Sequence, residues 1–348
     1  MTKNLKELPL KKILIRSTNW IGDAIMTTPA VRTIKENFPD AEVTMLALPW
    51  MADVFSASPY VDKIFSYDKK GNHHGLSGMM RLGQQIHDCG FDAAILLQNA
   101  FEAALITFLA RIPVRAGYKR DGRSLLLSHS VKIRKETRKI HQVFYYQRLL
   151  EELGLTCGSN ELFLQLPEEE KEWAVKYRKK IDSNMVIGVN PGAAYGPAKC
   201  WPAEKYGELA AYLHKETGAQ FLVFGTETDT ATGDVIARYS SENIDNMAGK
   251  TSLAQAMSLI DICDVFVTND SGLMHVAAAL NKPLVAIFGS TDPVATGPFS
   301  ENAFVLQKKM SCQPCLKQEC SKGHFRCMHD ISVSDVADSI LRIAGLAS

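Results

Sequence analysis

The sequence predicts an α/β protein made of two doubly wound domains. Short apolar runs alternate with amphipathic stretches of helical period, which is the pattern of parallel strands connected by helices. The alternation starts again after residue 184, and 348 residues correspond to about two domains of ordinary size. Apolar residues make up 46% of the chain and charged residues 22%, a composition typical of folded globular proteins.

The first half opens with the run KILIR at residues 12–16, which is typical of a buried parallel strand. Apolar residues then recur at helical spacing until Pro39 and Asp40, which end the helix. The same reasoning predicts further strands at 42–47, within 59–65 and at 92–97, and helices at 24–37 and 79–89.

The second half follows a charged helical stretch and a polar break at residues 182–184. Strands are predicted at 185–189, 220–225, 265–269 and 284–288, and helices at 168–180, 203–217, 253–260, 273–280 and 333–344. We therefore expect an N-terminal domain at 1–175, a C-terminal domain at 176–332, and a last helix at 333–348 that can pack back on the N-terminal domain.

Charge and composition exclude several classes of protein. The 39 basic and 38 acidic residues leave a net charge of +1, which argues against a nucleic-acid-binding protein. The longest apolar stretch, residues 103–110, is much shorter than the roughly 18 residues of a membrane span, and residues 1–16 lack the features of a signal peptide. We expect a cytoplasmic protein with reduced or metal-bound cysteines.

Ligands of open α/β sheets bind beyond the carboxyl ends of the strands, so the loops that follow strands are the candidate sites. Asp23 follows the first strand and is either a helix cap or a reactive carboxylate. Residues 190–202 follow the first strand of the second half and include Lys199. Gly192 and Gly196 in that loop allow a ligand to approach the backbone closely.

Ser271 and Gly272 open a helix directly after a strand. Backbone N–H groups at a helix N-terminus suit a phosphate or diphosphate. Asp270 either caps this helix or contacts the ligand. His275, in the first turn, is expected to be neutral, and it either donates to a phosphate or packs in the core.

Residues 225–229 form another loop after a strand. Glu227 and Asp229 in it are either solvated or similar to the acid that accepts ribose hydroxyls in nucleotide-binding folds. Two phosphate-binding signatures are absent. Residues 248–252 (AGKTS) lack the first glycine of a Walker A loop, because Ile244 occupies that position, and no G-x-G-x-x-G motif follows the first strand.

Three segments in combination resemble one enzyme family. They are Gly22-Asp23, residues 191–202 (PGAAYGPAKCWP) and residues 268–280 (TNDSGLMHVAAAL). With them the chain resembles the ADP-heptose:lipopolysaccharide heptosyltransferases of glycosyltransferase family 9, in particular the heptosyltransferase II branch, over nearly its whole length. The resemblance implies a GT-B fold, with two Rossmann-like domains facing each other across a cleft. The N-terminal domain would bind the acceptor and the C-terminal domain the sugar nucleotide.

The resemblance also implies an activity and a set of site residues. The implied reaction transfers L-glycero-D-manno-heptose from ADP-heptose to the first heptose of the inner core on Kdo-lipid A, with inversion and no required cofactor. The implied catalytic residues are Asp23 as the base and Lys199 on the diphosphate. The implied nucleotide-sugar contacts are Gly192, Lys199, Thr226, Asp229 with Glu227 as its alternative, Thr251 and Leu253 beside the adenine, Asp270, Ser271, Gly272 and His275.

An inner-core acceptor is anionic, so basic residues are expected in the N-terminal half. The candidates are Lys119, Arg120 and Arg123, followed by a basic segment at 131–141. These residues either contact the acceptor and the anionic lipid of the inner membrane surface or form a solvated charged face.

Four cysteines close to the C-terminus form a C-x2-C-x4-C-x6-C pattern. The first pair has the spacing of zinc ligands, but the second pair is irregular. A zinc site and a set of reduced structural thiols both remain open for Cys312, Cys315, Cys320 and Cys327.

Two other functions remain open. The second interpretation is a GT-B enzyme that uses another nucleotide sugar. It would be another glycosyltransferase or a nucleotide-sugar epimerase. A non-catalytic module that binds a sugar nucleotide is the third interpretation, although Asp23, Lys199 and His275 are all present.

Overall fold

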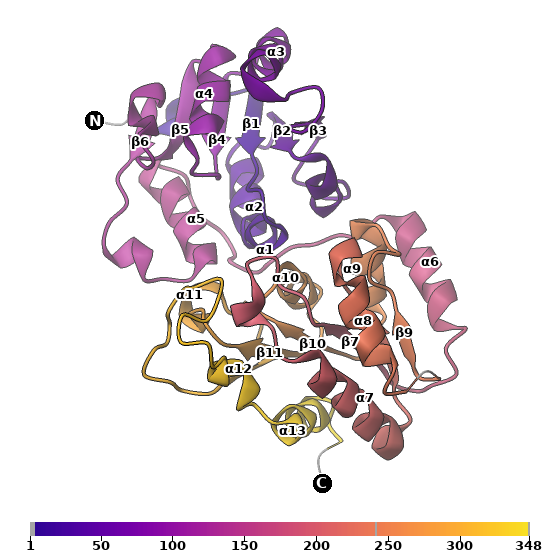
Figure 1. Ribbon diagram of the computed structural model, residues 1–348. Coiled ribbons are helices and arrows are strands. Elements are labelled where there is room, and N and C mark those ends of the chain that lie inside the picture. The colour runs from indigo at the N-terminus through magenta and orange to yellow at the C-terminus, as the bar shows by residue number, and fades with distance from the viewer. Residues whose placement is uncertain (1–3, 241, 347–348) are drawn as a thin grey trace. The chain divides into compact units, whose positions relative to one another are not determined.

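The computed structural model describes residues 4–240 and 242–346 (Figure 1). The chain divides into two compact units, Met1–Gln165 and Leu166–Ser348. Each unit contains one six-stranded sheet, and every strand pair in both sheets is parallel. The prediction of two doubly wound α/β halves is therefore confirmed.

The sheet of the first unit has the order β3-β2-β1-β4-β5-β6. Its strands are β1 (Lys12–Arg16), β2 (Glu42–Ala47), β3 (Lys63–Ser66), β4 (Ala93–Leu96), β5 (Val114–Tyr118) and β6 (His129–Val131). Ile13 in β1 pairs with Val43 on one side and Ala93 on the other, so β1 is a central strand. The order reverses direction between β1 and β4, which makes their carboxyl ends the expected ligand site of this sheet.

The helices of the first unit are α1 (Ile21–Met26), α2 (Thr28–Asn37), α3 (Gly75–Asp88), α4 (Phe101–Leu109) and α5 (Gln142–Glu152), with short 3₁₀ turns at Leu5–Glu7, Pro49–Val54, Arg123–Leu126 and Glu136–Arg138. The single helix predicted at 24–37 is thus divided between α1 and α2. Pro29 lacks the N–H that would bond to the Ile25 carbonyl, and the Thr28 hydroxyl donates to that carbonyl instead, at 2.8 Å.

The second sheet has the order β12-β11-β10-β7-β8-β9, which repeats the topology of the first. Its strands are β7 (Val186–Asn190), β8 (Gln220–Val223), β9 (Ile244–Asn246), β10 (Val265–Asn269), β11 (Leu284–Phe288) and β12 (Ala303–Gln307). Its helices are α6 (Glu168–Arg178), α7 (Ala203–Thr217), α8 (Thr230–Ala237), α9 (Leu253–Asp261), α10 (Gly272–Ala279), α11 (Pro293–Thr296), α12 (Arg326–His329) and α13 (Val333–Ile343), with 3₁₀ turns at Pro197–Lys199 and Glu227–Asp229.

Two helices belong to a different part of the molecule than expected: α6 crosses the expected domain boundary at residue 175, and α13 is the last helix. Helix α6 spans that position and packs against α9, and its Tyr177 hydroxyl donates to Asp245 at 3.1 Å, so α6 belongs to the second unit. Helix α13 packs against α7, β11 and β12, with Val336 and Ile340 in the second core. The last helix is therefore part of the second unit, and the expectation that it can pack back on the N-terminal domain is corrected.

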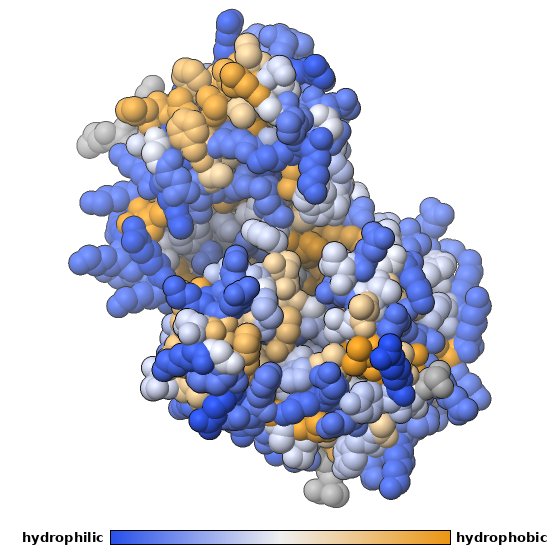
Figure 2. Space-filling view, viewed as in Figure 1, coloured by the Kyte–Doolittle hydropathy of each residue, from blue (hydrophilic) through white to orange (hydrophobic). Residues whose placement is uncertain are grey.

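On the face shown in Figure 2 hydrophilic side chains predominate, and apolar side chains of the first unit gather over α4. Phe101 and Phe108 of that helix are exposed. In the described part of the chain, no helix combines the length and the apolar character needed to cross a bilayer.

Candidate active site

The loops expected to bind a nucleotide follow β7 and β10, the two central strands of the second sheet. These strands are direct neighbours, with Thr268 of β10 opposite Asn190 of β7. The winding of the sheet reverses between them, so their carboxyl ends form its topological switch point. The two loops therefore meet at the position where open α/β sheets bind ligands.

An ion pair connects the two loops. Lys199 Nζ lies 2.6 Å from Asp270 Oδ2, and the two side chains are only 13% and 6% exposed. The Thr291 hydroxyl donates to the same carboxylate oxygen at 2.6 Å, and the Lys199 ammonium lies 5.0 Å from the centre of the Tyr195 ring. The cap of α10 is Ser271, so the interpretation of Asp270 as that cap is wrong. Asp270 instead orients the lysine.

The N-terminus of α10 has the properties of an anion site. The Ser271 hydroxyl accepts from the backbone N–H of Met274 at 3.4 Å and from the Asn190 amide at 2.7 Å. The first N–H groups of a helix have no partner within the helix and carry partial positive charge, so they attract a phosphate. Gly272 is partly exposed in the first turn, whereas His275 is buried. The structure thus brings Lys199, Asp270, Ser271 and Gly272 to one switch point.

Asn269, at the end of β10, holds the surrounding loops together. Its Oδ1 accepts from the Trp201 backbone N–H and from the Tyr206 hydroxyl, both at 3.1 Å. Its Nδ2 donates to the carbonyl of Pro191 at 2.6 Å. Sequence reasoning placed Asn269 inside a family motif but gave it no role, because its partners are distant in the chain.

Asp229 has a structural role that the sequence did not predict. Its Oδ2 accepts from the backbone N–H and the hydroxyl of Thr226, at 2.8 and 2.7 Å, in a capping box. A Cβ at Gly192 would lie 2.6 Å from Asp229 Oδ1, so this loop approaches only because residue 192 is glycine. Glu227, in the same turn, is exposed.

The predicted adenine segment lies beside that turn. The Gly249 N–H donates to the Gly225 carbonyl at 3.1 Å, and a Cβ at Gly249 would lie 3.0 Å from the Cα of Glu227. Thr251 and Leu253 are both half-buried, and Leu253 is the first residue of α9. The structure therefore brings the proposed adenine and ribose contacts together in the second unit.

Asp23 lies in the first unit, at the third position of α1. The cap residue of α1 is Trp20, so the alternative interpretation of Asp23 as the cap is wrong. Burial raises the pKa of the Tyr146 phenol, and the negative charge of Asp23 raises it further, while Arg120 opposes it. Asp23 is half-buried, and its charge acts on Tyr146 of α5, a residue that the sequence did not identify.

The three predicted acceptor residues differ in environment. Lys119 and Arg120 are exposed, and the basic side chains at 132, 134, 135, 138 and 139 are exposed as well. Arg123, in contrast, is fully buried and donates to the backbone carbonyls of Gln98 and Tyr118. Burial lowers the pKa of this guanidinium to about 10. The expectation that Arg123 faces an acceptor is corrected: it supports the loop from inside.

A second polar network at the switch point of the first sheet was also missed. Arg16 at the end of β1 is buried, with its guanidinium 5.4 Å from the centre of the Tyr67 ring. Tyr67 donates to Glu102 in the first turn of α4, which also pairs with Lys69. Burial lowers the pKa of Arg16 to about 10. The sequence indicated only a strand at 12–16.

The four clustered cysteines are free thiols: Cys312, Cys315, Cys320 and Cys327. Within residues 4–240 and 242–346, no three His, Cys, Asp or Glu side chains are arranged to hold a metal ion. The segment at residues 312–327 that carries these cysteines (the cysteine segment) instead packs on the loop at residues 190–202 that carries Lys199 (the lysine loop). The Tyr195 hydroxyl donates to the Leu316 carbonyl at 2.9 Å, and the Ala198 N–H donates to the Gln318 carbonyl at 3.0 Å. This segment therefore supports the loop that carries Lys199.

Comparisons with known proteins agree with this architecture. The sequence model of glycosyltransferase family 9 (heptosyltransferase) matches residues 79–326. Lipopolysaccharide heptosyltransferase 2 of Salmonella typhimurium strain LT2 is 34% identical over 340 residues, which are 94% of this chain and 97% of that protein. Its Escherichia coli K12 counterpart is 33% identical with the same coverage.

The fold also matches a solved structure from this family. The structure of E. coli ADP-heptose LPS heptosyltransferase II covers 96% of this chain and 98% of its own, with 31% identity and a TM-score of 0.81. The fold is accordingly GT-B, with two Rossmann-like domains. On this evidence the chain belongs to glycosyltransferase family 9 and is a glycosyltransferase of the heptosyltransferase family.

Proposed function

We propose that the protein transfers L-glycero-D-manno-heptose from ADP-heptose to the first heptose of the lipopolysaccharide inner core, carried on Kdo-lipid A. Relatives named lipopolysaccharide heptosyltransferase 2 support this acceptor. The observation that carries the donor assignment is the Lys199–Asp270 pair at the N-terminus of α10. A cation and helix N–H groups at one switch point suit a diphosphate.

The donor would bind to the second unit. Lys199, the Ser271 hydroxyl and the first N–H groups of α10 would contact the diphosphate, and His275 would pack beneath them. Thr226, Thr251 and Leu253 would surround the adenosine, with Gly192 allowing a close approach of the backbone. Because Thr226 occupies Oδ2 of Asp229, the ribose hydroxyls would be accepted by Asp229 Oδ1 or by the exposed Glu227.

Asp23 would act as the base on the acceptor. The acceptor hydroxyl oxygen forms the new bond to the anomeric carbon while its proton passes to the Asp23 carboxylate, a role worth about 10²–10⁴-fold in rate. The bond from the anomeric carbon to the phosphate oxygen breaks, and ADP leaves with the electron pair on the opposite face. Lys199 and the α10 N–H groups would stabilise that charge, at about 3–4 kcal/mol for one such contact. None of these steps requires a cofactor.

The acceptor would be recognised by the first unit. Lys119 and Arg120 are exposed cations that suit the carboxylates and phosphates of an inner core. The exposed basic side chains at 132–139 would face anionic lipid at the cytoplasmic surface of the inner membrane.

A reconstituted assay tests the proposal. The full-length protein is incubated with heptosyl-Kdo-lipid A and ADP-heptose, and the product is detected by mass spectrometry. We expect one added heptose, loss of product in Asp23→Asn with ADP affinity retained, and normal turnover in the control Asp40→Asn, an exposed carboxylate. Turnover of Asp23→Asn within about tenfold of the wild type would remove the base assignment.

Two further outcomes would contradict the proposed activity as a whole. Preferential thermal stabilisation by UDP or GDP over ADP would indicate a different nucleotide sugar. Binding of ADP-heptose without turnover on any inner-core acceptor would indicate a non-catalytic binding module.

A further inference from the structure

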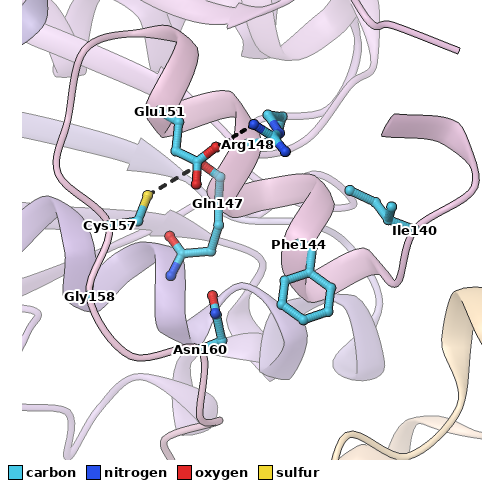
Figure 3. Close-up of a pocket in the computed structure, with 8 residues that line it drawn as sticks. All are labelled: Ile140, Phe144, Gln147, Arg148, Glu151, Cys157, Gly158 and Asn160. Atoms are coloured by element: carbon cyan, nitrogen blue, oxygen red, sulfur yellow. Dashed lines mark hydrogen bonds and ion pairs between the residues drawn. The ribbon is translucent and has the colours of Figure 1, made fainter. Parts of the chain in front are cut away.

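The first unit contains a cavity. None of the residues proposed above to contact the donor or the acceptor lines it. Its volume is about 310 Å³, and it lies between α5 and the segment at residues 157–160 (Figure 3). This volume is at the lower end of the range for small-molecule sites. The cavity is therefore large enough for one compact ligand.

A buried amide lines this cavity. Gln147 of α5 is only 2% exposed, and its Oε1 accepts from the Thr33 hydroxyl at 3.1 Å. Its Nε2 has no hydrogen-bond partner among the residues that the structure describes. Figure 3 shows the amide extending from α5 toward the segment that carries Gly158 and Asn160. A buried donor without an acceptor is unfavourable, and a rotation of this amide into the cavity would bring the nitrogen to a ligand oxygen.

The charges of the lining do not favour an anion as that ligand. Arg148 Nη1 lies 2.9 Å from Glu151 Oε2, and this pair neutralises the guanidinium. Burial raises the pKa of the Cys157 thiol to about 11, so the thiol is neutral at physiological pH. The Asn160 amide is neutral as well. The lining has many hydrogen-bonding groups but no net charge.

An aromatic side chain completes the lining. Phe144, on α5, keeps 40% of its surface exposed. The negative face of an aromatic ring attracts the slightly positive C–H groups of a ligand. A sugar ring has C–H groups on its faces and hydroxyl groups at its edge, which matches a phenyl ring next to neutral amides and a neutralised Arg–Glu pair.

We propose that this cavity binds one uncharged sugar ring. Gln147 Nε2 donates to a hydroxyl oxygen, Asn160 and the Arg148–Glu151 pair hydrogen-bond the other hydroxyls, and Phe144 packs on the C–H face. The sugar is either a residue of the saccharide acceptor that does not react or a free sugar, since both present the same chemistry. This site is independent of the proposed donor site.

Protection of Cys157 from alkylation measures occupancy directly. The whole protein is treated with iodoacetamide at about pH 9, where about one per cent of the Cys157 thiol is the reactive thiolate, in saturating mannose, galactose or inorganic phosphate, and labelling of each cysteine is followed by mass spectrometry. We expect a sugar to slow labelling of Cys157 several-fold and phosphate to have no effect. Cys89 is equally half-buried but lies at the end of α3, outside the cavity, so its labelling should not change.

Variants of the lining test the two contacts. Gln147→Leu and Phe144→Ala should lose the protection of Cys157, whereas the control Gln84→Leu, on the exposed face of α3, should retain it. The Phe144 ring is partly exposed, so Phe144→Ala is expected to fold. This variant therefore still tests the proposal if Gln147→Leu does not fold.

Kinetics distinguish the two sources of the sugar. A raised KM for the lipid-linked acceptor with unchanged kcat in both variants would assign the cavity to an acceptor residue. Protection by free sugar with an unchanged acceptor KM would assign it to a free sugar. The proposal fails if no sugar protects Cys157 and both variants keep the wild-type KM, or if phosphate alone protects.

Discussion

Lys199 Nζ and Asp270 Oδ2 lie 2.6 Å apart although 71 residues separate them in the chain. Both side chains are largely buried, and Thr291 donates to the same oxygen. A buried ammonium held by one carboxylate is already oriented, so a phosphate meets a fixed cation and little conformational entropy is lost on binding. In the proposed function, the pair would therefore hold the switch point of the second sheet ready for a diphosphate.

Replacement of Lys199 by alanine should weaken ADP binding. A hydrogen bond to a charged group contributes about 1.5–3 kcal/mol, so we expect a loss of affinity of about tenfold to 100-fold by isothermal titration calorimetry. Lys215→Ala, on the exposed end of α7, serves as the control and should bind ADP normally. Unchanged ADP affinity in Lys199→Ala would move the lysine away from the diphosphate.

Gly196→Ala should displace the lysine loop. Gly196 has φ +142°, and a Cβ there would lie 2.6 Å from the Gln318 carbonyl oxygen of the cysteine segment. Such backbone strain costs about 1–3 kcal/mol, and the clash should push the loop away from Asp270. We expect a lower thermal stability together with a higher KM for the nucleotide sugar.

Gly218→Ala is the matched control for that substitution. Gly218 also has a positive φ, +70°, but no atom lies within 4 Å of the added Cβ. This variant should lose stability and keep its KM. An equal change of KM in both variants would show that the cysteine segment does not position Lys199.

Substitutions of Arg123 and Arg120 should separate an effect on stability from an effect on acceptor binding. Arg123→Met leaves buried carbonyl groups without a donor, at about 1–3 kcal/mol for each, so chemical denaturation should show a large loss of stability. Arg120→Met, at an exposed position, should change stability by less than about 0.5 kcal/mol and raise the KM for the acceptor. The reverse pattern would contradict the assignment of the two arginines.

The cap of α13 should make stability depend on pH. Hydrogen bonds from the Ser332 backbone and side chain lower the pKa of Asp335 below the ordinary value of an aspartate. A carboxylate with a lowered pKa stabilises the fold above its unfolded pKa, and the contribution is lost as pH falls through the folded value. Asp335→Asn should therefore reduce the free energy of unfolding at pH 7, by about 0.5–2 kcal/mol for a weakened capping box, and this loss should shrink as pH falls below the ordinary aspartate pKa of about 3.9 and through the lower folded value.

Asp338 provides the control for that measurement, because it is exposed on the same helix. Asp338→Asn should leave the pH dependence of urea denaturation unchanged. A constant difference between Asp335→Asn and the wild type from pH 3 to pH 7 would rule out a role for the carboxylate charge.

The central strands were predictable because each is a continuous apolar run buried on both faces. The ranges expected for β1, β2, β10 and β11 coincide with the observed ones. Of the four edge strands only β3 was predicted, within 59–65; β6, β9 and β12 were not, nor was the inner strand β5. β6 and β9 have only three residues each, and β12 exposes Phe304 and Val305, so the pattern of hydropathy there is too short or too mixed to indicate a strand.

The site was predictable only as separate loops. Lys199 and Asp270 were each identified from a loop after a strand, but their pairing depends on two distant loops meeting beside β7 and β10. The cap of α10 was one of two interpretations of Asp270, but the next residue, Ser271, provides it. The burial of Arg123 likewise depends on carbonyls from another loop, which no local pattern reveals.

The repeated strand order has a consequence for how this scaffold changes. Each sheet reverses its own winding, and each reversal has its own set of loops. On the proposed assignment of donor and acceptor, the two units can therefore diversify separately, the second retaining a shared leaving group while the first adapts to a new saccharide. Exchange of single lobes between homologues is a natural route to altered glycan chemistry.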